Sequence, residues 1–199
     1  IGRPLDALVI GPGLGTGERA RELLAAALRL AVPLVIDADA LTLVAADAAL
    51  AASVAGRSAS TALTPHPAEA ARLATTTSDE IQRDRLQAAL TLARRTNAAV
   101  VLKGTGSVLT FADGRWAINT SGNPGLASGG TGDVLSGMLG ALLAQGIEID
   151  TALPLAVAVH GAAADALVAQ GVGPLGLTAS ELGPAARRLL NDAAGAGRE

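Results

Sequence analysis

The chain has 199 residues, a length suited to one compact domain, and it contains no cysteine. Without cysteine there is no disulfide scaffold, no iron–sulfur cluster and no thiolate zinc site. The formal net charge is −3, and the chain has one Trp, one Phe and no Tyr. A general nucleic-acid binder needs a basic face and stacking aromatic side chains, so we do not expect nucleic acid as a partner.

Membrane association is not expected either. Two of the longest apolar runs, residues 134–147 and 151–164, contain glycine or proline and are shorter than the roughly 20 residues that a spanning helix needs. The N-terminus lacks the basic segment and apolar block of a signal peptide. These features predict a soluble cytoplasmic protein.

The predicted elements alternate between short apolar strands and helices. In chain order, the first half reads as strand 7–10, helix 18–30, strand 34–36, helices 40–44 and 47–55, strand 62–64 and helix 68–74. The second half reads as a helix capped at Thr77 and running through residue 95, strand 99–102, a hairpin of 107–111 and 116–119, a loop over 120–130, helices 131–144 and 150–169, and a last helix capped at Thr178 that ends near residue 191. We expect a frayed tail over residues 193–199.

The strands are continuously apolar rather than alternating, which is typical of a parallel sheet covered by helices on both faces. We therefore predict a single α/β domain over residues 1–199, with three layers and a mostly parallel sheet. No element precedes the first strand, which indicates a missing N-terminal portion. Ligands of such sheets bind at the carboxyl ends of the strands. The candidate loops are therefore residues 11–17, 37–39, 64–69 and 103–107.

Residues 119–137, N-T-S-G-N-P-G-L-A-S-G-G-T-G-D-V-L-S-G, run from a glycine-rich loop into an apolar helix. Gly129, Gly130 and Gly132 allow the backbone to approach a ligand closely and to turn its N–H groups inward. The positive end of the helix dipole points at the same place, which suits a transferring phosphoryl group. Asp133, in the first helical turn, is either a capping acid or a general base for a substrate hydroxyl.

The loop at residues 11–17 lies between a strand and a helix and suggests a dinucleotide fingerprint. In that interpretation Asp37, which follows Gly15 by 22 residues, is the ribose-binding acid. Thr16 and Glu18 stand where the G-x-G-x-x-G fingerprint requires glycine. The alternative is a tight turn with close helix–strand packing.

Three further residue types are candidates for chemistry. Lys103, the one lysine against 14 arginines, closes a strand and is placed to contact a nucleotide phosphate or ribose, unless it is simply solvated. His66 is constrained by two prolines, and either contacts substrate or bonds to a carbonyl. His160 lies in mid-helix and is interpreted as a packing residue. Asp37 and Asp39 fit either a water-mediated magnesium site or a helix N-cap.

Five blocks together resemble one known family: V-I-G-P-G-L-G, L-V-I-D-A-D-A-L, L-T-P-H-P-A-E, V-V-L-K-G and G-N-P-G-L-A-S-G-G-T-G-D-V-L-S-G. In this order, from about residue 8 to residue 165, they resemble the ADP/ATP-dependent NAD(P)H-hydrate dehydratases of the ribokinase-like superfamily. The resemblance implies a ribokinase-like α/β/α fold. It also implies dehydration of the S-epimer of hydrated NADH or NADPH to NAD(P)H, driven by ADP or ATP with Mg²⁺. The products are AMP or ADP and phosphate, formed through a phosphorylated hydrate.

The same resemblance implies roles for individual residues. Asp133 is the catalytic base and contacts the hydrate, together with Gly13, Gly15, His66 and Asn123. The residues implied in nucleotide binding are Lys103, Gly104, Thr105, Gly106, Ser107, Gly130, Thr131 and Gly132. No residue is assigned as a metal ligand.

The resemblance further implies a homo-oligomer, and a fusion or partnership with an NAD(P)H-hydrate epimerase. Domains of this family are longer, with an N-terminal stretch that supplies a strand and a substrate contact and has no counterpart here. Three other functions stay open on the sequence alone. They are a ribokinase-like kinase of a vitamin-precursor alcohol, a dinucleotide-dependent dehydrogenase and a non-catalytic nucleotide-binding remnant.

Overall fold

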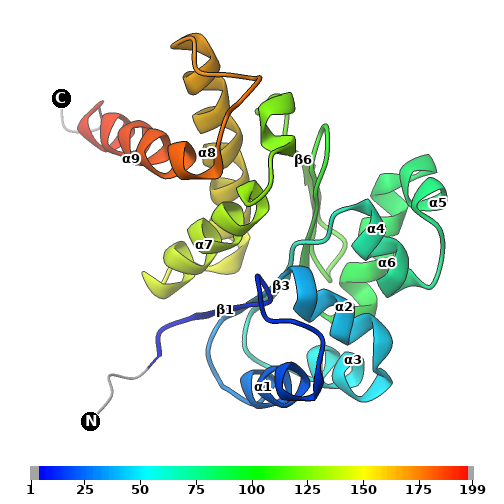
Figure 1. Ribbon diagram of the computed structural model, residues 1–199. Helices are drawn as coiled ribbons and strands as arrows, with labels where there is room; N and C mark the ends of the chain where they lie inside the picture. Colours follow the sequence, from blue (N-terminus) through cyan, green and yellow to red (C-terminus); the bar gives the residue numbers. More distant parts are fainter. Residues whose placement is uncertain (1–4, 197–199) are drawn as a thin grey trace.

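The computed structural model describes residues 5–196, which form one sheet with helices on both of its faces (Figure 1). The strands are β1 (Leu8–Ile10), β2 (Leu34–Ile36), β3 (Thr61–Leu63), β4 (Ala99–Leu102), β5 (Val108–Thr110) and β6 (Trp116–Ile118). The helices are α1 (Glu18–Leu28), α2 (Ala38–Ala46), α3 (Ala48–Ala55), α4 (Pro67–Ala74), α5 (Ser78–Arg83), α6 (Arg85–Thr96), the 3₁₀ turn η1 (Pro124–Ala127), α7 (Thr131–Ala144), α8 (Ile149–Ala169) and α9 (Ala179–Ala196).

The six strands lie in the order β1-β2-β3-β4-β5-β6. The first four pair in parallel, with Leu8 opposite Leu34 and Ala62 opposite Ala99. β5 and β6 are antiparallel, with Val100 opposite Thr110. Because β5 turns back along β4, the loop at residues 103–107 lies at the edge of the sheet where the parallel strands end. The mostly parallel sheet predicted from the sequence is confirmed.

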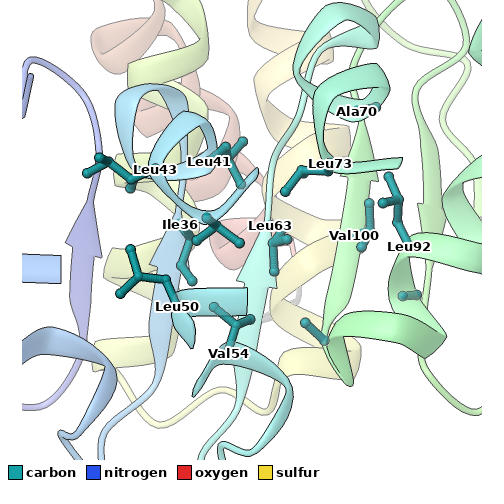
Figure 2. Close-up of a cluster of buried hydrophobic side chains, with 14 of the residues drawn as sticks. Ile36, Leu41, Leu43, Leu50, Val54, Leu63, Ala70, Leu73, Leu92 and Val100 are labelled. Atoms are coloured by element: carbon teal, nitrogen blue, oxygen red, sulfur yellow. The ribbon is translucent and has the colours of Figure 1, made fainter. Parts of the chain in front are cut away.

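Alternate residues of the buried strands serve the two faces of the sheet, because successive side chains of a strand point in opposite directions. Leu34 and Ile36 belong to a core cluster formed with α1 to α6, part of which is drawn in Figure 2. Val35, between them, belongs to a second cluster with α7 and α8. A third cluster joins α9 to α7 and α8. The continuously apolar strands are therefore explained by burial on both faces, and the three predicted layers are confirmed.

Most predicted elements agree with the structure to within two residues at either end, and three differences are larger. The expected helix through residue 95 is broken at Asp84, whose carboxylate accepts the Gln87 N–H at 3.0 Å and begins α6. The loop over 120–130 contains η1. The last helix runs to Ala196 rather than to residue 191. The rest of the predicted tail, residues 197–199, lies outside the described residues.

α8 is longer than the apolar run of residues 151–164, since it continues past Asp165. Within residues 5–196, α8 passes a test of length and apolar composition for crossing a membrane, and the bent pair of α2 and α3 passes it only when both are counted as one span. Half of the apolar window of α8 is buried inside the fold, where the helix packs against α7 and α9. Such burial is typical of a core helix.

Candidate functional site

A cavity of about 600 Å³ opens at the carboxyl ends of the parallel strands. Five parts of the chain that are distant in sequence form its walls: the start of α4, the loop after β4, the loop that contains η1, the beginning of α7 and the middle of α8. Its lining residues include His66, Lys103, Gly104, Thr105, Gly106, Ser107, Asn123, Thr131, Gly132 and His160. Most of the predicted nucleotide contacts therefore share one cavity.

The N-terminal turn of α7 presents free backbone donors. Gly130 is its N-cap residue, with a φ of +84° that favours glycine. Among the described residues, the N–H groups of Gly132 and Asp133 have no acceptor. The Thr131 hydroxyl, by contrast, donates to two carbonyls of the preceding loop, at 2.6 and 2.9 Å. The backbone of this turn, rather than the Thr131 side chain, is thus free to bind an anion.

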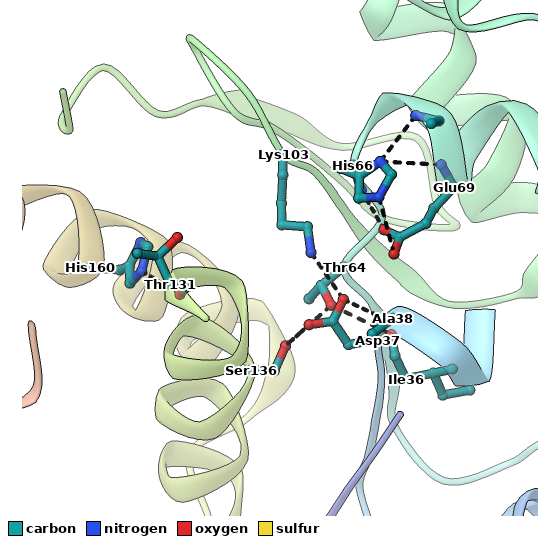
Figure 3. Close-up of polar contacts among 11 residues, drawn as sticks. Ile36, Asp37, Ala38, Thr64, His66, Glu69, Lys103, Thr131, Ser136 and His160 are labelled. Carbon is teal, nitrogen blue, oxygen red and sulfur yellow. Dashed lines mark hydrogen bonds and ion pairs between the residues drawn. The ribbon is translucent and has the colours of Figure 1, made fainter. Parts of the chain in front are cut away.

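Lys103 follows the end of β4, and its side chain extends towards Asp37 (Figure 3). Its Nζ lies 3.0 Å from Oδ1 of Asp37. A Cβ built on Gly132 would lie 3.2 Å from the same Nζ, so the ammonium group rests against α7. The only lysine of the chain thereby places its charge beside the free amides.

Arg85, the first residue of α6, holds the loop at residues 103–107 in place through hydrogen bonds. It donates to the carbonyls of Leu102, at 3.0 Å, and Gly106, at 3.3 Å. A Cβ on Gly104, whose φ is +145°, would lie 2.6 Å from Arg85 Nη1. Partial burial lowers the pKa of Arg85 from its ordinary value. Arg85 could not be identified from the sequence, because no local pattern links α6 to the loop.

The wall of the cavity formed by the loop that contains η1 is hydrogen-bonded to α8. Asp165 accepts the Gly122 N–H at 2.7 Å and an Asn123 Nδ2–H at 2.9 Å. The other end of the Asn123 amide accepts the Gly125 N–H at 3.0 Å, which caps η1. Asn123 lines the cavity, but both ends of its amide are engaged in ordering the wall.

His160 is 7% exposed, and its Nε2 lies 2.9 Å from the Thr131 carbonyl oxygen. Burial lowers the pKa of His160; the Thr131 carbonyl opposes this shift, and the charge of Lys103 lowers the pKa further. A neutral imidazole that donates from Nε2 fits these surroundings. His160 is a packing residue, as predicted, and it also holds the first turn of α7 in place.

His66 caps α4 and faces the cavity. Its Nδ1 accepts the N–H groups of Ala68 and Glu69 at 3.1 and 3.3 Å. Glu69 accepts the His66 N–H at 2.8 Å, and its other oxygen lies 3.3 Å from Nε2. The alternative of a carbonyl partner for His66 is wrong, because the ring bonds to backbone N–H groups. The side chain is half exposed and lines the cavity.

Asp133 does not line the cavity, and its side chain is exposed. It precedes Ser136 by three residues, so the two side chains project from the same side of α7. Ser136 donates to Asp37 at 2.6 Å, and the Asp37 carbonyl touches Gly11. Asp133 therefore lies on the Ser136 side of α7, outside the lining of the cavity.

Much of the loop at residues 11–17, which follows β1, is exposed. A Cβ on Gly11 would lie 1.7 Å from the Asp37 carbonyl oxygen, which confirms the close-packed turn. Gly13 and Gly15 have φ values of +65° and +77° and open space around them. The Gly15 N–H donates to Asp39 at 2.8 Å. In the described part of the chain the Gly13 N–H has no acceptor, so it is the freer donor of the two.

Asp37 cannot serve as a ribose-binding acid, because it is only 1% exposed. Oδ1 accepts from Ala38 N and Lys103, and Oδ2 accepts from Ser136. This geometry contradicts the dehydrogenase interpretation and confirms the N-cap. It also contradicts a magnesium site between Asp37 and Asp39. No group of three or more His, Asp or Glu side chains in residues 5–196 is arranged to hold a metal ion.

The family model described as NAD(P)H-hydrate dehydratase matches residues 2–186. The chain belongs to the NAD(P)H-hydrate dehydratase family. The ADP-dependent (S)-NAD(P)H-hydrate dehydratase of Neisseria meningitidis is 43% identical over 189 residues, which cover 94% of this chain and 64% of that protein. A bifunctional NAD(P)H-hydrate repair enzyme of Coxiella burnetii is 41% identical, over 92% of this chain and 36% of that protein. The chain thus spans less than two thirds of the length of either relative.

Solved structures agree with the family. The ADP/ATP-dependent NAD(P)H-hydrate dehydratase of Bacillus subtilis, co-crystallised with ATP/Mg²⁺, matches with a TM-score of 0.83 and 31% identity, over 94% of this chain and 64% of that one. A ribokinase-like superfamily protein of Enterococcus faecalis matches with a TM-score of 0.72 and 28% identity, over 92% of this chain and 63% of that one. The expected ribokinase-like fold is confirmed for the part of the dehydratase that this chain represents.

Proposed function

We propose that this dehydratase-family domain dehydrates the S-epimer of hydrated NADH or NADPH at the expense of ADP or ATP. The proposal rests on the first turn of α7, which brings together the groups that would bind phosphate and the carboxylate that would act as base. Lys103 and Gly132 line the cavity next to N–H groups that have no acceptor among the described residues, whereas the exposed side chain of Asp133 lies outside the lining. A phosphoryl group held at the turn is then within reach of the Asp133 carboxylate.

The nucleotide occupies the cavity in this proposal. The loop of residues 103–107, with its small and hydroxylated side chains, surrounds the nucleoside, and the α7 amides and Lys103 bind the phosphates. The described residues provide no carboxylate cage, so Mg²⁺ enters with the phosphates of ADP or ATP. The B. subtilis relative, co-crystallised with ATP/Mg²⁺, supports this assignment.

The hydrate binds beside Asp133 and the loop at residues 11–17, with Gly13 as a donor. Asp133 takes the proton of the hydroxyl on the saturated nicotinamide carbon as that oxygen attacks the terminal phosphorus. The new O–P bond replaces the bond from phosphorus to the nucleotide, and the α7 amides stabilise the developing charge. The ring nitrogen lone pair then expels phosphate, and loss of a proton from the neighbouring carbon restores dihydronicotinamide.

The test is to mix hydrated NADH with ADP or ATP and to follow the return of the NADH absorbance. Asp133→Asn should retain ADP binding and lose activity by about 10²–10⁴-fold. Asp79→Asn, which changes an exposed acid in the first turn of α5, is the matched control and should be fully active. A stable phosphorylated alcohol without NADH would identify a kinase, and ADP binding without turnover would identify a nucleotide-binding remnant.

Cooperation with an NAD(P)H-hydrate epimerase is part of the proposal, since the C. burnetii relative is a bifunctional repair enzyme. Assembly into a homo-oligomer and a cytoplasmic location stay predictions.

A further inference from the structure

Asp37 is a buried carboxylate that the proposed mechanism does not use. It lies at the end of β2, between the cavity and the loop at residues 11–17, and is 1% exposed. Buried carboxylates are rarely retained without a partner, because an ionised oxygen loses its hydration. Here both oxygens are bonded: Oδ1 to Ala38 N and Lys103 Nζ, and Oδ2 to Ser136 Oγ.

Asp37 is itself held firmly in place. Its N–H donates to the Ile10 carbonyl at 3.0 Å, and its own carbonyl packs against Gly11. The next residue, Ala38, has a φ of +48°, a conformation that alanine seldom adopts. A residue keeps such a strained conformation only where the surrounding contacts hold it there. The contacts of Asp37 with Ile10 on β1, Lys103 after β4 and Ser136 on α7 hold this turn in place.

Lys103, in contrast, depends on Asp37 for its position. Among the described residues, Asp37 is the one partner of its ammonium group. The side chain is 21% exposed, and a four-carbon chain of this kind is flexible unless its end is bound. With the pair formed, Nζ lies against Gly132 at the free N–H groups of α7.

We propose that Asp37 is a positioning residue, which holds the Lys103 ammonium against the first turn of α7 and so determines where the nucleotide phosphates bind. The inference rests on the proposed function in one respect, that the cavity takes ADP or ATP. The phosphates meet a preformed group of one cation and several amides, so little side-chain entropy is lost on binding. Because Asp37 is 1% exposed and both of its oxygens accept hydrogen bonds, the carboxylate is shielded from the phosphates.

The sequence offers a direct probe, because Lys103 is its only lysine. Protein grown with lysine labelled with ¹³C at Cε, and carrying no lysine in its tag, gives a single lysine signal in NMR spectra. In the wild-type protein, ADP should shift this signal on titration. In Asp37→Asn the signal of the free protein should move towards that of a solvated lysine, and the Kd for ADP should rise about tenfold.

Two controls separate positioning from general damage to the fold. Asp47 is also a buried N-cap aspartate with a basic partner, Arg21, but it caps α3 away from the cavity. Asp47→Asn should leave the lysine signal and the Kd unchanged. In a Lys103→Met background, Asp37→Asn should change the Kd by less than about twofold, because a residue that acts through Lys103 has no effect without it.

Every outcome decides one of the two proposals. If ADP does not bind to the wild-type protein and does not shift its lysine signal, the nucleotide site is wrong. If ADP binds but Asp37→Asn is folded and keeps the wild-type signal and Kd, only the positioning proposal is overturned. The same holds if Asp37→Asn weakens ADP equally in the Lys103→Met background. Should Asp37→Asn not fold, the wild-type protein decides instead: a Lys103 signal in the ADP-free protein that matches a solvated lysine would show that Asp37 does not hold the ammonium group, and would overturn the proposal.

Discussion

Ala38, in the turn after β2, has a positive φ because of the contacts that its two neighbours make. It stands between Asp37, which faces inwards to Lys103, and Asp39, which faces Gly15. Its positive φ lets the two carboxylates point to different sides of the site. The strain of an alanine in this conformation is about 1 kcal/mol.

Ala38→Gly should therefore raise the free energy of unfolding by about 0.5–1 kcal/mol, measured by urea denaturation, because glycine adopts a positive φ without strain. Ala52→Gly, at an exposed position within α3, is the control and should lower it by about 1 kcal/mol. A loss of stability in Ala38→Gly would show that the positive φ is not a property of the folded protein.

His160 makes stability depend on pH. Burial keeps its pKa below the unfolded value of 6.5, so the stabilisation is complete above pH 6.5 and is lost as the pH falls towards the folded-state pKa. In that range His160 contributes a slope of at most about 1.4 kcal/mol per pH unit. His160→Gln keeps an N–H at the position of Nε2 and does not titrate. Thermal unfolding followed between neutral and mildly acidic pH should show a smaller slope for this variant than for the wild type, and equal slopes would contradict the assignment.

At the scale of elements, the wall loop of the cavity, residues 122–127, is connected to α8 through Asp165. The carboxylate bonds a backbone N–H and the Asn123 amide, and Asn123 in turn caps η1. The loop has little other regular structure, so these few hydrogen bonds contribute much of its order.

Asp165→Ala should leave α8 intact and weaken ADP binding by about three- to tenfold, because the hydrogen bonds that order the wall loop contribute roughly 1 kcal/mol each. Amide hydrogen exchange should become faster in the wall loop and stay unchanged in α6. Asp165→Asn retains one acceptor oxygen and should lie between the alanine variant and the wild type. If exchange in the loop does not change, something other than Asp165 orders this wall.

At the scale of the whole molecule, the position of α7 on the sheet decides where its N-terminal turn lies. Gly140 allows this approach: a Cβ there would lie 2.3 Å from Val9 Cγ2 on β1. A second close approach occurs at Gly161 of α8, where a Cβ would lie 2.2 Å from Ser121 Oγ. Two glycines thus let both helices of this layer pack closely against the parts that surround the site.

Gly140→Ala should lower the free energy of unfolding by about 1–3 kcal/mol through overpacking, although alanine is the better helix former. Gly137→Ala, one turn earlier in α7, is the matched control, because nothing lies within 4 Å of its Cβ and the residue is exposed. That variant should be stabilised by about 0.5–1 kcal/mol. Chemical denaturation of both variants measures the difference, and equal behaviour would show that α7 does not rest on β1.

Local patterns in the chain were sufficient to locate the strands and helices, the Thr77 capping box and the glycine-rich loop before α7. Strand and helix periodicity, turn residues and caps act between residues that are close in sequence, so they can be read without coordinates. The five motif blocks led to the dehydratase family for the same reason, since each block is short and continuous.

Only the folded chain revealed which of these segments meet. Asp37 bonds to Lys103 and Ser136, which are 66 and 99 positions further along the chain. Those contacts depend on strand order, on how α7 is rotated about its axis and on the depth to which Gly140 lets it approach β1. The exposed side chain of Asp133 and the bond from His160 to α7 depend on the same rotations, which no local pattern encodes because packing between distant segments sets them.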